Sequence, residues 1–197
     1  MIVRLCSIAC LTVLIGNSLE LSAGEKERPD FMAILKKFGT PGPEHKLLQP
    51  LIGSWKVEVK MYMEPDAKAT LTKGQSKREW VLGKRYMAEH YKGNFFGMDF
   101  EGMGITGYDR YKKRFVGGWI DSMSTGMISQ TGQYNPKTKS FTFTSIVDDA
   151  STGGKKQKGI DVIRIISNDE HTLTMFRQPL KGGKKTKFME IRYTRAQ

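Results

Sequence analysis

The feature that most constrains the fold is a strict alternation of apolar and charged residues that begins at Trp55. From Trp55 to Met63 every second residue is apolar, and Lys56, Glu58 and Lys60 stand between them. Successive side chains of a β-strand point to opposite faces, so this segment is predicted to be a strand. One face of that strand is expected to be buried and the other solvated.

Nine further segments have strand-like composition, with Gly, Asn, Asp and Pro between them. No long helical segment separates these candidates, and parallel strands would need such crossovers, so antiparallel hairpins are expected. The nine segments are GQSKREWVL, KRYMAEHYKG, FEGMGITGYD, RFVGGWID, TGMISQTGQY, SFTFTSIVD, GIDVIRIIS, HTLTMFRQ and TKFMEIRYTR.

About ten such strands predict an all-β protein, folded as a single antiparallel up-and-down β-barrel. Closure of the barrel removes exposed strand edges. Side chains can just fill a barrel of about eight strands, whereas a barrel of about ten should enclose a cavity. The alternative is a collapsed or sandwich-like sheet with a filled core.

The first residues are typical of a secretory signal, because a basic start at Arg4 precedes a short apolar run and small residues at Ser22 and Ala23. We expect a signal peptide over 1–23, a helical lead-in over 24–52 and the barrel over 53–195. The mature protein is then exported to the periplasm or secreted. A retained anchor and a lipoprotein site at Cys10 are the alternatives.

Both cysteines, Cys6 and Cys10, lie within the expected signal peptide. The mature chain would then form no disulfide, thiolate metal site or cysteine nucleophile. The formal net charge is +12 at pH 7. Such a charge favours anionic partners without specifying a fold.

The lead-in is predicted to form two short helices that plug one end of the barrel. Asp30 adds negative charge near the first helix start and Gly39 ends that helix, whereas Pro43 begins the second. A helical face with three-and-four spacing, which must pack on something, consists of Phe31, Ile34, Leu35 and Phe38.

Hairpin parity assigns successive connections to alternate ends of the barrel. The connections opposite the lead-in are longer and basic, so that end is the predicted mouth. The mouth is expected to carry Phe95, Phe96 and Met98 beside the mouth lysines, which we define as Lys155, Lys156, Lys158, Lys181, Lys184, Lys185 and Lys187. These lysines either attract an acidic ligand or surface, or are solvated hairpin residues.

The segment Gly53-Ser54-Trp55 resembles the Gly-x-Trp element of lipocalins and other calycins. The resemblance implies that a basic residue late in the last strand, Arg192 or Arg195, stacks over Trp55. We expect Trp55 to close the base of the barrel as a core aromatic rather than to contact ligand.

A closer resemblance rests on GPEHKLLQPLIGSWKVEVKM, EWVLGKRYM, FFGMDFEGMGITGYDRYKKRFVGGWIDSMSTGM and FMEIRYTR. Together these segments, from about Pro43 to Arg195, are similar to the bacterial family known as domain of unknown function fifteen seventy-nine. The resemblance implies a calycin-like barrel and brings no catalytic assignment. Glycines within the strands, as in GMGITGYD, are expected to mark tight bends or close backbone packing.

The mature sequence has three histidines, His45, His90 and His171, and none has zinc-ligand spacing. No metal site, cofactor or catalytic residue is therefore predicted. Two alternatives stay open: a hydrolase that pairs His90 with Ser122 or Asp121, and haem held by His90 or His171.

The preferred hypothesis is an exported barrel that binds a small apolar or amphipathic ligand, with or without an acidic group. One alternative is an enzyme using Tyr86, His90, Glu101 or Asp121, and another is an interaction module with basic mouth loops. A membrane surface is a further candidate partner, whereas the basic runs lack the interleaved aromatics of a nucleic-acid platform. The expected ligand-binding residues are Val57, Val59, Met61, Tyr86, His90, Phe95, Phe96, Met98, Trp119 and Met123.

Overall fold

A computed structural model describes residues 30–63, 68–149 and 152–197. The predicted signal peptide, residues 1–23, lies outside these residues. Between residues 30 and 52, three short helices precede the sheet: α1 (Phe31–Gly39), α2 (Pro43–Lys46) and the 3-10 helix η1 (Gln49–Leu51). Among the helices in the described ranges, none has the length and apolar character needed to cross a bilayer.

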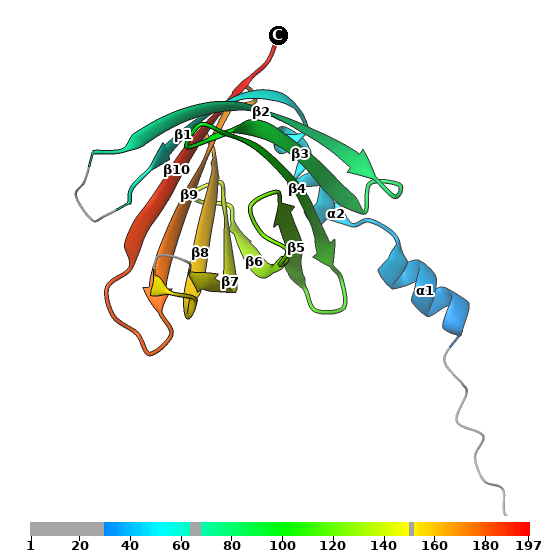
Figure 1. Ribbon diagram of the computed structural model, residues 1–197. Coiled ribbons are helices and arrows are strands. Elements are labelled where there is room, and N and C mark those ends of the chain that lie inside the picture. Colours follow the sequence, from blue (N-terminus) through cyan, green and yellow to red (C-terminus); the bar gives the residue numbers. More distant parts are fainter. Residues whose placement is uncertain (1–29, 64–67, 150–151) are drawn as a thin grey trace, which may run out of the picture.

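Ten antiparallel strands form one closed barrel, in which each strand pairs with its sequence neighbours and β1 pairs with β10 (Figure 1). The predicted fold class is therefore confirmed. The strands are β1 (Gly53–Met61), β2 (Thr70–Val81), β3 (Tyr86–Phe95), β4 (Met98–Asp109), β5 (Arg114–Asp121), β6 (Ile128–Asn135), β7 (Ser140–Asp149), β8 (Lys155–Ile165), β9 (Glu170–Pro179) and β10 (Thr186–Arg195).

Some mouth connections are tighter than the sequence suggested. β8 already begins at Lys155, which pairs with Asp149, so part of the predicted lysine loop is strand. Only Phe96 and Gly97 join β3 to β4, and both have positive φ angles, 52° and 85°. Such angles fit the right-handed twist of a two-residue hairpin. At these two connections the rim is therefore built from strand ends rather than from long loops.

The lead-in closes one end of the barrel, which we call the plugged end. Leu48 and Leu51, delivered by α2 and η1, are 1% and 0% exposed. They pack with four buried side chains of the wall: Met87, Phe115, Phe141 and Phe143. The 3-10 turn fits here because Pro50 lies within its first turn, where a missing N–H costs no hydrogen bond. The predicted plug is confirmed for this half of the lead-in.

Helix α1 does not belong to the plug, contrary to expectation. It contains no buried residue and lies outside the strands (Figure 1). Its C-terminal end is held by Arg110, which donates hydrogen bonds to the carbonyls of Lys37 and Thr40, and by stacking of Phe38 on Tyr111. The predicted apolar face is therefore largely solvent-exposed, with Phe31 67% exposed. Periodicity identified the helix, but the plugged end was already filled by α2 and η1.

Inward-facing glycines make room for large side chains that lie flat on the inner wall. The ring of Trp119, on β5, covers Gly102 and Gly104 of the neighbouring strand β4. Tyr91 likewise lies over Gly74 and Gly93. A methyl group at these positions would overlap the covering ring, which explains glycine inside otherwise regular strands. The expectation of close packing at GMGITGYD is met for Gly102 and Gly104.

We expect Gly102→Ala to destabilise the fold by about 1–3 kcal/mol, because its Cβ would overlap the Trp119 ring. Gly118→Ala is the matched control, since the nearest atom to its Cβ would be 3.7 Å away. The control should stay within about 0.5 kcal/mol of the parent protein. Urea unfolding followed by tryptophan fluorescence measures both. Equal stabilities for the two variants would contradict this account of the glycines.

Candidate functional site

Strand register determines which side chains enter the barrel. Trp55 faces inward with 1% exposure, and the antiparallel pairs place Ser76 and Arg195 opposite it. Alternation along each strand then assigns every second residue to the interior. Beyond the plug, the interior contains two layers. We call them the arginine layer (Ser76, Arg78, Glu89, His171 and Tyr193) and the mouth layer (Phe95, Phe100, Trp119, Asp161, Met175, Arg177 and Met189).

The arginine layer is a buried polar network across four strands. Arg78, on β2, is 2% exposed and lies 2.7 Å from His171 Nε2 through Nη1. Its Nη2 donates to Glu89 Oε1 at 3.0 Å, and the Ser76 hydroxyl donates to the same oxygen at 2.7 Å. The guanidinium carbon also lies 4.4 Å from the ring centroid of Tyr193. A buried guanidinium with these partners joins β2, β3, β9 and β10.

His171 is held neutral in this layer. Burial, together with the positive charges of Arg78 and Arg195, lowers the pKa of His171 to about 2. Its ring stacks on Tyr193 at 4.4 Å, and Trp55 meets it edge-on at 4.3 Å. Because Arg78 can only donate, Nε2 must accept, which places the proton on Nδ1. Such a histidine is a structural hydrogen-bond acceptor, and its burial among these side chains does not fit a haem ligand.

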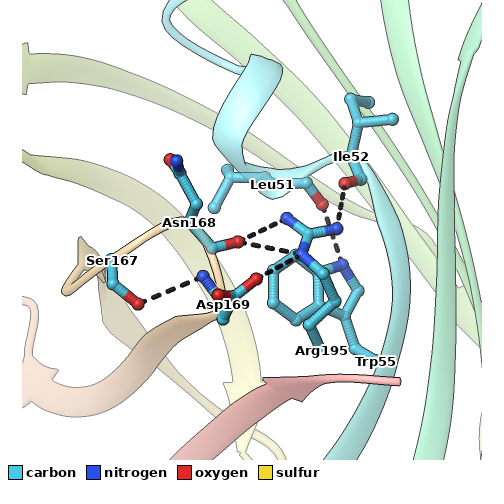
Figure 2. A network of polar contacts seen from close by, with 7 residues as sticks. All are labelled: Leu51, Ile52, Trp55, Ser167, Asn168, Asp169 and Arg195. Atoms are coloured by element: carbon cyan, nitrogen blue, oxygen red, sulfur yellow. Dashed lines mark hydrogen bonds and ion pairs between the residues drawn. The ribbon is translucent and has the colours of Figure 1, made fainter. Parts of the chain in front are cut away.

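Arg195 fastens the plug to the barrel (Figure 2). Its guanidinium lies 4.3 Å from the ring of Trp55, while Nη1 donates to the carbonyl of Ile52 at 3.1 Å. Nε donates to Asn168 O and Asp169 Oδ1, each at 3.0 Å. Trp55 Nε1 donates to Leu51 O at 3.0 Å. The predicted cation stack over Trp55 is therefore confirmed for Arg195, whereas Arg192 pairs with Glu170 on the outside.

The mouth layer is apolar but only partly covered. Its hydrophobic side chains Phe100, Trp119, Met175 and Met189 are partly buried against the core cluster that contains Trp55 and Tyr91. Phe100 contacts both Tyr91 and Phe95, with ring-centroid distances of 5.6 Å and 5.9 Å. Since these side chains point inward, the surface they leave uncovered faces the interior, which solvent reaches through the mouth.

Two opposite charges lie within the mouth layer. Asp161 and Arg177 project from neighbouring strands, and their nearest atoms, Oδ1 and Nη1, are 3.9 Å apart. Their side chains are 17% and 16% exposed. Gly159 has no side chain between Arg177 and Ser145, so both lie over its Cα. Burial raises the pKa of Asp161 to about 6, and the charge of Arg177 opposes the shift only in part.

At the rim, a cavity of ≈ 260 Å³ adjoins Arg177. Its wall includes Met63, Pro179 and Phe188, and two of the mouth lysines, Lys184 and Lys187, border it. Arg177 lies 4.8 Å from the ring centroid of Phe188 and occupies an inward position on β9, so it borders both this cavity and the interior. A cavity of this size is at the small end of ligand pockets.

The sequence-predicted ligand residues are distributed over several environments. Val57, Val59 and Met61 face inward but are buried in the core, whereas Phe95 and Trp119 reach the mouth layer. Exposed positions at the rim hold the remaining predicted residues of the mouth: Phe96, Met98 and Met123.

Tyr86 and His90 were expected to bind ligand inside the barrel, but the strand register places both on the outer face. Trp80 and Arg78 face inward and pair with Met87 and Glu89, so the alternate residues Tyr86 and His90 face outward. His90 is exposed, and Asp121 instead accepts a hydrogen bond from Trp119 Nε1 at 3.0 Å. The structure therefore does not bring His90 and Asp121 together as a histidine-based hydrolase would require.

The sequence reasoning missed Arg78, Glu89, Asp161 and Arg177. Each is a charged residue at an inward position of its strand, and alternation alone could have flagged it once the register was known. Within the described ranges, no group of three or more His, Cys, Asp or Glu residues is placed to hold a metal ion.

The mouth lysines contribute charge at the rim and on the outer wall rather than inside. Lys185 lies 4.2 Å from the ring centroid of Phe176, an outward residue, and Lys187 pairs with Glu190 at 3.0 Å. Inward positions carry carboxylates as well as cations, among them Glu89, Asp121 and Asp161. The positive charge predicted from composition is therefore mostly external.

Closure, strand order and plug define a ten-strand antiparallel barrel, consistent with a calycin-like barrel. The chain belongs to the family described as "Protein of unknown function (DUF1579)", which matches residues 40–195, so the resemblance seen in the sequence is confirmed. No curated protein matches the chain in sequence. A solved structure of a redesigned beta barrel is 11% identical, with 77% of this chain and 96% of that chain covered and a TM-score of 0.39.

Because the pKa of His171 is lowered in the folded state, the free energy of unfolding is expected to fall in acid. The unfolded state takes up a proton near pH 6.5, whereas the folded state does so only near pH 2. The stabilisation from a neutral His171 is thus complete above pH 6.5 and is lost as the pH falls from 6.5 toward 2, at about 1.4 kcal/mol per pH unit.

His171→Gln keeps a hydrogen-bond acceptor but cannot titrate. We expect the variant to be less stable at pH 7.5 by about 1–3 kcal/mol, with a deficit that shrinks as the pH falls from 6.5 to 4.5. Urea unfolding at several pH values measures the difference. His90→Gln is the exposed control and should leave the profile unchanged. A constant deficit for His171→Gln across this range would contradict the buried neutral histidine.

Proposed function

We propose that the protein is an exported barrel that binds a small apolar or amphipathic ligand in its mouth layer. The observation that carries this proposal is the partial exposure of inward-facing side chains such as Phe100, Trp119 and Met175. Apolar groups that face a solvent-reached interior gain free energy when a ligand covers them, at about 25 cal/mol per Å².

The composition of the mouth layer supports a binding role. Aromatic rings offer rigid apolar surface, and the flexible side chains of Met175 and Met189 adapt to ligands of different shape. The arginine layer and the plug supply a rigid floor for such a site. Arg78 is hydrogen-bonded within the arginine layer, and the leucines of the plug are buried. Export of the mature chain, by removal of residues 1–23, belongs to the same proposal.

Native mass spectrometry tests this function on protein recovered from its own host without detergent. The folded protein should carry a reproducible added mass that disappears on denaturation. Met189→Trp fills the mouth layer and should abolish the added mass. Met103→Trp is the matched control, because Met103 is 48% exposed on the outer face of β4 and should leave the added mass unchanged.

Circular dichroism verifies that both variants keep the barrel. Bare protein in the parent and in both variants would contradict the proposed function. An added mass that survives Met189→Trp would contradict its location in the mouth layer.

A further inference from the structure

We propose that Asp161 and Arg177 together bind the hydroxyl group of an otherwise apolar ligand, so that the mouth layer selects neutral alcohols over fatty acids and amines. The inference deepens the proposed function and rests on it. It concerns which polar group the mouth layer accepts, not whether the layer binds a ligand.

The two charges of the mouth layer form no direct hydrogen bond with each other. Asp161 Oδ1 and Arg177 Nη1 are 3.9 Å apart, which is beyond hydrogen-bond range. A single oxygen that reaches both side chains can donate to the carboxylate and accept from the guanidinium. A hydroxyl group has this combination of one donor and accepting lone pairs, whereas a carboxylate has no proton to donate.

The carboxylate of Asp161 contains an unsatisfied acceptor. Asp161 Oδ1 is buried and has no hydrogen-bond partner among the described residues. A buried carboxylate oxygen without a donor is costly. The nearby Arg177 does not supply one, because its Nη1 is 3.9 Å away and donates to the carbonyl of Phe176 at 3.2 Å. An alcohol brings this donor once a rotation of the Asp161 side chain uncovers the oxygen, which is covered in the structure.

Each charge of the pair disfavours one ionic ligand. A carboxylate ligand at this position would meet the like charge of Asp161, and an ammonium ligand would meet the like charge of Arg177. A neutral polar group avoids both repulsions.

The geometry also provides a place for the apolar part of such a ligand. Arg177 borders the rim cavity of ≈ 260 Å³, whose wall includes Met63, Pro179 and Phe188. Met175 pairs directly with Asp161 across β8 and β9, and Met189 pairs with Met175. A short alkyl chain attached to the hydroxyl group therefore contacts apolar side chains whether it lies in the rim cavity or along Met175 and Met189.

Calorimetric titration of the full chain at pH 7.5 tests the selectivity with three eight-carbon probes: octan-1-ol, octanoate and octylammonium. We expect octan-1-ol to bind at least about tenfold more tightly than either charged probe. Arg177→Met should weaken octan-1-ol binding by about tenfold, because a hydrogen bond from a charged donor is lost.

Asp161→Asn should narrow or invert the preference, since it removes the negative charge that repels octanoate. Asp148→Asn is the matched control: Asp148 lies on the outer face of β7, opposite Lys156, and its loss should leave all three affinities within about twofold. Circular dichroism confirms that each variant is folded, and Arg177→Met remains a second test if Asp161→Asn does not fold.

The outcomes separate the two proposals. Binding of octanoate as tightly as octan-1-ol by the parent protein would overturn this inference and leave the binding function standing. Octan-1-ol binding that is unaffected by both Asp161→Asn and Arg177→Met would mean that the gap between them accommodates water only, and would also overturn it. Failure of all three probes to bind would overturn the inference together with the proposed apolar site.

Discussion

Closure of ten strands into one barrel is the constraint on which the remaining structure depends, because a barrel this wide is not filled by wall side chains alone. At one end the protein meets this constraint with residues of the lead-in. Leu48 and Leu51 occupy the base, and Arg195 ties the last strand to the carbonyl of Ile52 and to the Trp55 ring. The closing seam between β1 and β10 is therefore also the place where the plug is fastened.

The interior becomes more open in steps from the plug to the mouth. Arg78 donates to Glu89 and to a neutral His171, which offsets much of the cost of its burial, although Arg78 Nε and His171 Nδ1 have no hydrogen-bond partner among the described residues. In the mouth layer Asp161 and Arg177 remain 3.9 Å apart and the apolar side chains are only partly covered. A buried floor beneath a partly covered apolar wall is the physical basis for proposing a ligand site.

Much of the fold could be predicted from local patterns. The alternation after Trp55 gave the first strand, and turn residues separated the rest, because strand periodicity and turn chemistry are properties of short segments. The site could not be predicted in the same way. A shift of one residue reverses the face of every side chain, and the segment that contains Tyr86 and His90 did not specify which face was buried.

The sequence by itself determined an all-β chain of ten strands with a helical lead-in, and the Gly-x-Trp segment at its base, because these follow from periodicity and from residue types next to one another. Only the tertiary structure decided that α1 stays outside, that Trp119 covers Gly102 and Gly104, and that Asp161 meets Arg177. These contacts depend on strand pairing around a closed ring, which joins residues far apart in the chain and is not encoded in any single segment.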